Sequence, residues 1–203
     1  MLAALDLAAR RGPRLLWQHV SIALDAGEAL LVRGANGAGK TTLLRILAGL
    51  ARAEHGTVSW RGRTVAPFAA AVRDDLLFVG HVPALRDELS AAENLASLAS
   101  LAAEPLAPPT LEAALAAVDL AAQAKLPARV LSQGQRRRVQ LALLASTSRP
   151  LWILDEPTTA LDADGARWLA ARVTQHLARG GLAVVSTHAP LEFSPARVKE
   201  LAL

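Results

Sequence analysis

The sequence predicts an α/β fold in which helices cover a mainly parallel sheet. Short apolar runs bounded by glycine, proline or charge indicate strands at residues 20–24, 29–33, 76–79, 151–155 and 182–186. Longer helical stretches separate these runs. Such alternation is typical of a parallel sheet, whose strands are buried on both faces and are therefore apolar along their whole length.

The composition agrees with one globular domain whose core is aliphatic. Hydrophobic residues make up 52% of the 203 residues and aromatic residues only 3%. A chain of this length buries roughly 70% of the surface that its unfolded form exposes, so it can carry its own core. There is no cysteine, which excludes disulfides, thiolate metal ligands and a cysteine nucleophile. We therefore expect a single domain over residues 1–203.

Charge and hydropathy narrow the possible partners. The net charge of +4 comes from scattered basic residues, and we interpret the longest run, Arg136-Arg137-Arg138, as part of a solvated positive surface. The N-terminus reaches a charge at Asp6, too early for a secretory signal, and no stretch approaches the roughly 18 apolar residues that span a bilayer. We expect no nucleic-acid partner, and we expect any role at a membrane to be peripheral.

A segment of different character, from about residue 83 to 148, is predicted to be mostly helical. Ser90 and Glu93 have the spacing of a capping box at a helix start, and leucines then recur along one side of that helix. Prolines in residues 105–109 end it, and a second helix is predicted to begin near Thr110. We expect a helical insert carried by the α/β core.

A glycine-rich loop between a predicted strand and a predicted helix carries the clearest chemical signal. Its residues are Gly34, Ala35, Asn36, Gly37, Ala38, Gly39, Lys40 and Thr41, and Thr42 continues into the helix. This is the spacing of a P-loop (Walker A), whose glycines let successive N–H groups point at phosphate oxygens. Lys40 would reach the β and γ phosphates of ATP and Thr41 would ligate Mg²⁺. An ordinary glycine-rich turn is the alternative.

Two adjacent carboxylates end the apolar run at residues 151–154. A buried strand that ends in this way can place Asp155 in the Mg²⁺ shell and Glu156 beside the attacking water as general base. The same pattern alone also fits a strand followed by an acidic turn. Its combination with the phosphate loop favours a site for ATP hydrolysis.

A third motif, Leu131-Ser132-Gln133-Gly134-Gln135, leads into a helix for which Ser132 is a plausible N-cap. Together with the two preceding elements it resembles the LSGGQ signature of the ATP-binding cassette (ABC) superfamily, over nearly the whole chain. The resemblance implies a P-loop NTPase core with a parallel sheet, a small antiparallel β part and a helical subdomain specific to the superfamily. It also implies a head-to-tail homodimer, in which Ser132 and Gly134 contact the γ-phosphate held by the other copy.

The resemblance assigns two further loops. Residues 159–162 look like the superfamily's D-loop, which crosses the dimer interface. Thr187 and His188 resemble its switch loop, in which the histidine donates to the γ-phosphate. The catalytic residues that the resemblance implies are thus Lys40, Glu156 and His188.

Two positions depart from the superfamily pattern. The superfamily usually has a Mg²⁺-contacting glutamine after the strand at residues 76–79, where this chain has Gly80 and His81; an imidazole could take that contact only through a neutral ring nitrogen. An ordinary loop histidine is the alternative. Adenine normally stacks on an aromatic side chain near residues 10–12, where only an arginine could stack on the base in this chain. Trp17, further along, is expected in the core.

These features together are similar to one branch of the superfamily. Gly-His at residues 80–81, Leu-Trp-Ile-Leu-Asp-Glu-Pro at 151–157 and Thr-His-Ala-Pro-Leu at 187–191 resemble the ATP-binding subunits of haem exporters in bacterial cytochrome c maturation. The resemblance implies a peripheral ATPase on the cytoplasmic face of the bacterial inner membrane, bound to integral-membrane permease subunits. The alternatives are an ATPase for another permease, a soluble cassette ATPase of the iron–sulfur assembly type, and an ATP-gated binding module with negligible hydrolysis.

Overall fold

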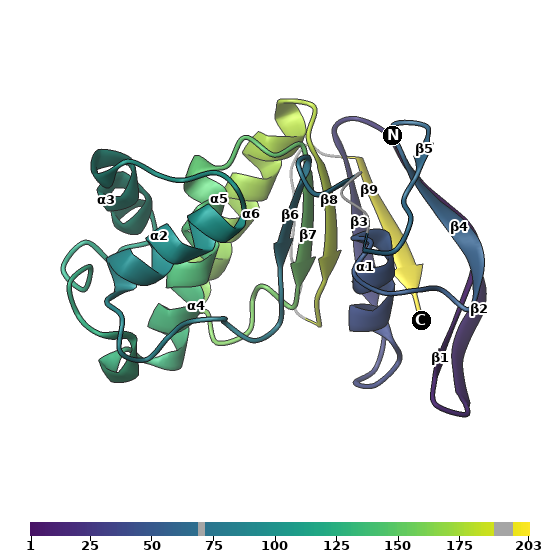
Figure 1. Cartoon of the computed structure of the whole chain (residues 1–203), viewed down its shortest axis with the longest axis horizontal. Coiled ribbons are helices and arrows are strands. Elements are labelled where there is room, and N and C mark those ends of the chain that lie inside the picture. The colour runs from purple at the N-terminus through teal and green to yellow at the C-terminus, as the bar shows by residue number, and fades with distance from the viewer. Residues whose placement is uncertain (69–71, 189–196) are drawn as a thin grey trace.

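The computed structural model describes residues 1–68, 72–188 and 197–203, which form two sheets and a group of helices (Figure 1). Within these residues the parallel sheet has the strand order β6-β7-β8-β3-β9, and the antiparallel sheet has the order β2-β1-β4-β5. The strands are β1 (Leu2–Arg11), β2 (Arg14–Leu24), β3 (Glu28–Arg33), β4 (His55–Trp60), β5 (Arg63–Thr64), β6 (Leu76–Val79), β7 (Leu151–Asp155), β8 (Leu182–Ser186) and β9 (Arg197–Ala202). The helices are α1 (Lys40–Leu47), α2 (Ala91–Leu101), α3 (Pro108–Ala117), the 3-10 turn η2 (Ala128–Val130), α4 (Gln133–Leu141), α5 (Leu143–Ser146) and α6 (Ala163–Ala178).

The parallel sheet confirms the predicted fold class, and its central strands are buried on both faces. Every residue of β7 and of β8 is buried, which explains why both read as continuous apolar runs. Along β7, Leu151 and Ile153 face the core that contains α1, whereas Trp152 and Leu154 face the core that contains α6. Because β7 and β8 pair in parallel, Asp155 lies opposite Ser186 at the carboxyl edge of the sheet.

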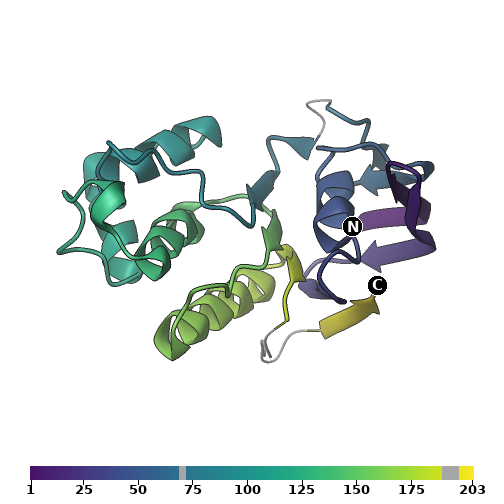
Figure 2. The same cartoon turned by 90° about the horizontal axis from the view of Figure 1, so that it is seen from below.

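Helix α1 packs between the two sheets. Leu43, Leu44 and Leu47 are fully buried and share one core with residues of β1, β3 and β7. Figure 2 shows the antiparallel strands beside α1 at the right, with the teal and green helices at the left end of the molecule. The start of α1, where the phosphate loop ends, is therefore held from both sides.

The helical segment contains α2 to α5, and its predicted start is confirmed. The Ser90 side chain accepts a hydrogen bond from the Glu93 backbone N–H, and the Glu93 carboxylate accepts one from Ser90 N, so α2 begins at Ala91 with a complete capping box. Helix α3 begins at Pro108, ahead of the predicted start near Thr110, because proline fits the first helical position, where no backbone donor is needed.

The strands β1, β4, β5 and β9 have no counterpart among the strands read from the sequence. Strand β1 is rich in alanine, and Asp6 within it has a φ of 49°, at an irregularity in its pairing with β2 and β4. Strand β9 carries Arg197, Lys199 and Glu200 and is largely exposed at the edge of the sheet, where β3 is its one partner among the described strands. These strands lack a continuous apolar run because they are not buried on both faces.

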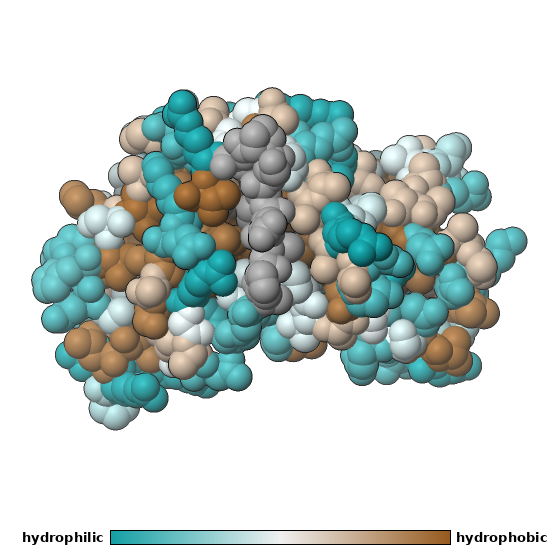
Figure 3. Space-filling view, turned by 180° about the vertical axis from the view of Figure 1, so that it is seen from behind, coloured by the Kyte–Doolittle hydropathy of each residue, from teal (hydrophilic) through white to brown (hydrophobic). Residues whose placement is uncertain are grey.

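Hydrophobic and hydrophilic side chains are both exposed on the surface of the molecule. In the view from behind, hydrophobic and hydrophilic residues are interspersed over both the helical end and the sheet end (Figure 3). Over the ranges that the structure describes, no helix has both the length and the apolar character needed to cross a bilayer.

Candidate nucleotide-binding site

The phosphate loop is shaped by glycines in the left-handed region. Gly37 and Gly39, which lie in the turn between β3 and α1, have φ values of 82° and 101°. A Cβ on Gly39 would lie 2.6 Å from Nε1 of Trp17, so the β2 indole leaves no room for a side chain there. Trp17 is 8% exposed, which confirms the prediction that it belongs to the core.

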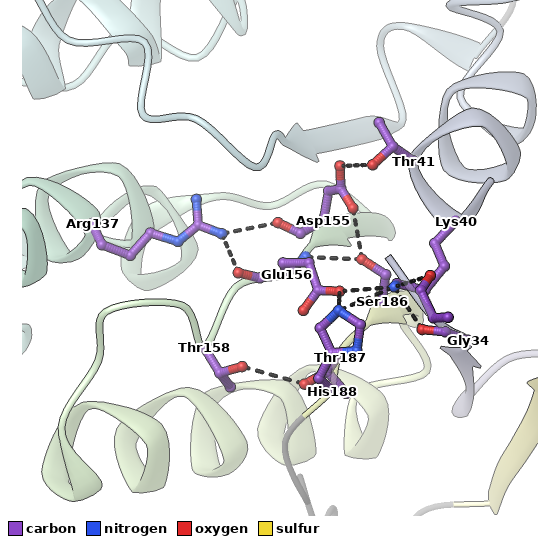
Figure 4. A network of polar contacts seen from close by, with 11 residues as sticks. Gly34, Lys40, Thr41, Arg137, Asp155, Glu156, Thr158, Ser186, Thr187 and His188 are labelled. Atoms are coloured by element: carbon purple, nitrogen blue, oxygen red, sulfur yellow. Dashed lines mark hydrogen bonds and ion pairs between the residues drawn. The ribbon is translucent and has the colours of Figure 1, made fainter. Parts of the chain in front are cut away.

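Lys40 lies at the centre of a cluster of polar groups (Figure 4). Its Nζ donates to the carbonyl oxygens of Gly34 at 2.8 Å and Ala35 at 3.3 Å. The same nitrogen is 3.4 Å from Oε1 of Glu156 and 3.1 Å from Nε2 of His188. Lys40 is 7% exposed, so its charge is balanced inside the protein by these carbonyl groups and the carboxylate.

Thr41 and Asp155 meet at the carboxyl edge of the sheet. The Thr41 hydroxyl donates to Oδ2 of Asp155 at 2.8 Å, and the Ser186 hydroxyl donates to Oδ1 of the same carboxylate at 2.7 Å. The Ser186 oxygen also accepts from the backbone N–H of Glu156 at 2.9 Å. Ser186 was not among the predicted site residues, although its place at the end of a buried strand next to β7 was a signal for it.

Glu156 and His188 also line the cavity around Lys40. Glu156 is 8% exposed, and its Oε1 lies 3.0 Å from Nε2 of His188. The structure thus brings together Lys40, Glu156 and His188, which come from a helix start and two loops that follow strands. They surround a cavity of about 500 Å³, lined by Arg11, Leu16, Asn36, Gly37, Gly39, Lys40, Thr41, Thr42, His81, Glu156, Thr159 and His188.

Two residues at positions that depart from the superfamily pattern also line the cavity. His81 is exposed and lines the cavity with Thr41, and Arg11 lines it near Leu16. Arg10 instead donates to the Pro13 carbonyl, outside this lining. Leu16 also lines the cavity, although no sequence pattern indicated it. Residues 189–191 of the Thr-His-Ala-Pro-Leu motif lie outside the described residues.

Ser132 and Gly134 are not part of that cavity. The Ser132 side chain accepts from Gln135 N at 3.2 Å, which confirms Ser132 as the N-cap of α4, and the Gln135 side chain completes a second capping box that was not predicted. A Cβ on Gly134 would lie 2.7 Å from the carbonyl oxygen of Ala160, so α4 and residues 159–162 approach closely within one chain. Within one chain, neither Ser132 nor Gly134 lines the cavity around Lys40.

The interpretation of residues 136–138 as a solvated positive surface was wrong. Arg137 is only 2% exposed, and the side chains of Arg136 and Arg138 are 19% and 17% exposed. Arg136 pairs with Asp87 at 2.6 Å, and Arg138 pairs with Asp162 at 2.6 Å. Burial lowers the pKa of Arg137 to about 10, which still leaves it charged at neutral pH. Of the three, only Arg137 is directed into the protein, where it bonds the carbonyl oxygens of Gly80 and Asp155, whereas Arg136 and Arg138 pair with exposed carboxylates.

The fold and this cluster together define a class of protein. A family model described as ABC transporter matches residues 17–159, and the chain belongs to that family. The "Cytochrome c biogenesis ATP-binding export protein CcmA" of Pseudomonas aeruginosa is 47% identical to it over 191 residues, which cover 94% of each chain. The resemblance predicted from the signature motif is thereby confirmed.

Solved structures show the same fold. An ATP-binding protein from Pyrococcus furiosus matches with a TM-score of 0.83 at 24% identity, over 98% of this chain and 96% of that one. A dimeric ATP-binding cassette in a post-hydrolysis state, bound to ADP and Pi, matches with a TM-score of 0.81 at 22% identity, over 93% and 88% of the two chains.

Proposed function

We propose that this chain is the ATP-hydrolysing subunit of a membrane transporter that serves haem handling in c-type cytochrome biogenesis. The observation that carries the proposal is the convergence of Lys40, Glu156 and His188 on one cavity, in a chain 47% identical to a cytochrome c biogenesis ATP-binding export protein. The convergence supports the chemistry, and the relative supports the process.

The Thr41 hydroxyl and the Asp155 carboxylate would hold a magnesium ion that enters with the nucleotide. Mg²⁺ takes oxygen ligands and usually keeps several waters, so one or two protein oxygens suffice. The Thr41 hydroxyl and the Asp155 carboxylate, 2.8 Å apart, are such a pair. No cluster of three or more His, Asp or Glu able to hold a metal occurs in the described ranges, which suits an ion that arrives with the nucleotide. When bound, Mg²⁺ would neutralise charge between the β and γ phosphates.

The other groups that line the cavity have separate roles in ATP hydrolysis. The backbone N–H groups of residues 34–41 and the Lys40 ammonium bind the phosphates, and His188 donates to the γ-phosphate. Glu156 accepts a proton from the attacking water. The contacts among Lys40, Glu156 and His188 are short enough that a γ-phosphate must enter between them and replace them.

Ser132 and Gly134 complete the site from a second copy. They start α4, whose N-terminus favours negative charge, yet they do not line the cavity of their own chain. A head-to-tail homodimer places each signature against the nucleotide of the partner. The likeness to a dimeric cassette supports the fold that such an arrangement requires.

The membrane partner is proposed to dock in a groove beside the end of β6. This groove has a volume of about 740 Å³ and is lined by residues of β6, α2 and the loop after α1. Its lining includes Phe68, Val82 and Leu101, which are 73%, 74% and 82% exposed. Gly80 lines the groove while His81 lines the nucleotide cavity, so an apolar cytoplasmic segment of an integral-membrane permease would adjoin the nucleotide site. Docking of this kind would hold the chain peripherally at the cytoplasmic face of the bacterial inner membrane, which is the location we propose for it.

The substitution Glu156→Gln tests the chemistry. Loss of the base should lower ATP turnover by about 10² to 10⁴ while ATP binding is retained. Steady-state phosphate release and equilibrium nucleotide binding are the two measurements. Glu112→Gln on α3, the same change outside the cavity, is the matched control and should turn over ATP as the unaltered chain does. Unchanged turnover in Glu156→Gln would remove Glu156 from its role.

The proposed role in c-type cytochrome biogenesis is tested in a strain that lacks the gene. Loss of the gene should abolish covalent haem in c-type cytochromes, and the tagged chain should purify with an integral-membrane subunit. Normal cytochromes c with a co-purifying permease would point to another transported substrate. A chain that stays soluble and brings down no permease would contradict the transporter proposal and favour an iron–sulfur assembly type of ATPase.

A further inference from the structure

One buried guanidinium binds the carbonyl groups at the carboxyl end of β7 and just after it. Nη2 of Arg137 donates to the carbonyl oxygens of Asp155 at 2.9 Å and Glu156 at 2.6 Å, and Nε donates to that of Pro157 at 3.2 Å. Three consecutive carbonyl groups thus converge on one side chain of α4 (Figure 4 shows the first two). A straight strand would point consecutive carbonyl groups in alternate directions, so the chain must turn sharply here.

The same guanidinium reaches the end of β6. Its Nη1 donates to the carbonyl oxygens of Gly80 at 2.8 Å and His81 at 3.3 Å, and to Oε1 of Gln140 at 2.6 Å. The Gln140 contact fixes the guanidinium from within α4. Arg137 therefore links the signature helix to both loops that flank the nucleotide cavity.

Glu156 is the residue whose backbone most needs this support. Its φ is 48°, in the left-handed region that a side chain with a Cβ rarely adopts. Both of its backbone groups are bound: the N–H donates to the hydroxyl and the carbonyl oxygen of Ser186, and the carbonyl oxygen accepts from Arg137. These bonds set the direction of the carboxylate, which ends 3.0 Å from His188.

We propose that Arg137 is a positioning residue for ATP hydrolysis, which holds Glu156 against the γ-phosphate and makes its place depend on the position of α4. The proposal rests on the proposed role of Glu156 as the base. A guanidinium is suited to this role because its planar fork of five donors can span several carbonyl groups at once, which the ammonium of lysine cannot. Arg137 thereby acquires a function that the charge of the run at residues 136–138 did not indicate.

The test separates positioning from binding and from folding. Arg137→Gln should lower kcat about 10- to 100-fold, the size of effect that a small misplacement of a catalytic group produces, with the Kd for ATP changed less than about threefold. Arg137→Lys keeps the charge without the fork and should be intermediate. Arg136→Gln, one residue away and bonded to Asp87 instead, is the matched control and should keep the unaltered kcat. Thermal melts of the full-length variants report folding.

A double-substitution cycle shows whether Arg137 acts through Glu156. In a Glu156→Gln background, adding Arg137→Gln should change the residual single-turnover rate less than about threefold, because the group being positioned is already lost. An equal loss in both backgrounds, or a parallel loss of ATP affinity, would overturn the proposal. If Arg137→Gln does not fold, Arg137→Lys carries the same cycle. If Glu156→Gln alone leaves turnover intact, the base assignment fails and this proposal fails with it, a result distinct from independent effects of the two residues.

Discussion

The environment of the His176 ring disfavours its protonated form. The ring stacks on Trp152 with ring centroids 3.8 Å apart and an interplanar angle of 6°, and Nε2 lies 3.2 Å from the Leu182 carbonyl oxygen. Burial is the main cause that lowers the pKa of His176, to about 4 from an ordinary 6.5. The folded protein therefore keeps a neutral ring under conditions in which the unfolded chain would protonate it.

This difference in pKa predicts a loss of stability in mild acid. Between pH 6.5 and 4 the unfolded chain binds more protons at this ring than the folded chain, so the free energy of unfolding falls as the pH falls. Allowing for the partial exposure of the ring, we expect about 1–2 kcal/mol from His176 across that window. Urea unfolding from pH 7.5 to 4.5 should show a weaker pH dependence in His176→Phe, which keeps the stacking. Parallel curves for the two proteins would contradict the assignment.

Among single residues, sequence patterns identified those whose chemistry depends on the local chain. Lys40 and Thr41 stand at a helix start after glycines. Asp155 ends one buried strand and His188 follows another, so the parallel sheet brings all four to one edge. Arg137 was missed because it stands in a charged run. Its helical spacing with Leu141 and Leu144, both buried, was the available signal that it faces inward.

At the scale of elements, α2 and α4 begin in the same way but serve different purposes. Ser90 and Ser132 each accept a hydrogen bond from the backbone N–H three residues on, at 3.2 Å in both helices. The Ser90 cap faces the helical segment, where the neighbouring backbone bonds to Leu126. The Ser132 cap is exposed at the start of the signature helix.

The shared geometry gives a matched pair of substitutions. Ser90→Ala and Ser132→Ala should each lower the free energy of unfolding by about 1 kcal/mol, because each removes one capping bond. Only Ser132→Ala should also lower ATP turnover, by about tenfold or more, the size expected when a hydrogen bond to a charged group is lost. Chemical denaturation and phosphate release measure the two effects. Equal turnover in the two variants would argue against contact between Ser132 and the nucleotide.

The elements that the sequence predicted well are those buried on both faces. Strands β6, β7 and β8 match the predicted bounds, and β3 begins one residue early, at Glu28. Strand β2 begins at Arg14, well before the predicted residue 20, because half of its residues face outward. Strand β9 pairs with β3, far away in the sequence, and local propensity does not report such pairing; β1 pairs with the adjacent β2 as well as with the distant β4.

At the scale of the whole molecule, the separation between the signature and the cavity of its own chain predicts assembly on ATP. Glu156→Gln, which should bind ATP without consuming it, is expected to run at twice the 21.3 kDa of one chain when ATP is present. Size exclusion with light scattering is the measurement.

The controls for this assembly lie in the phosphate loop and in the nucleotide. Lys40→Ala should remain a monomer with ATP because the ammonium that binds the β and γ phosphates is gone, and ADP should not support the dimer, since it lacks the γ-phosphate that Ser132 and Gly134 contact. A Glu156→Gln chain that stays monomeric at saturating ATP would refute the composite site.

The position of α1 between the two sheets couples their unfolding. The same three leucines, Leu43, Leu44 and Leu47, are buried against the antiparallel sheet on one side and the parallel sheet on the other. Detaching either sheet would bring those side chains into water and release the start of α1, where Lys40 and Thr41 stand. The two sheets should therefore melt in a single cooperative transition, and a nucleotide held at the helix start would raise the temperature of that one transition for both.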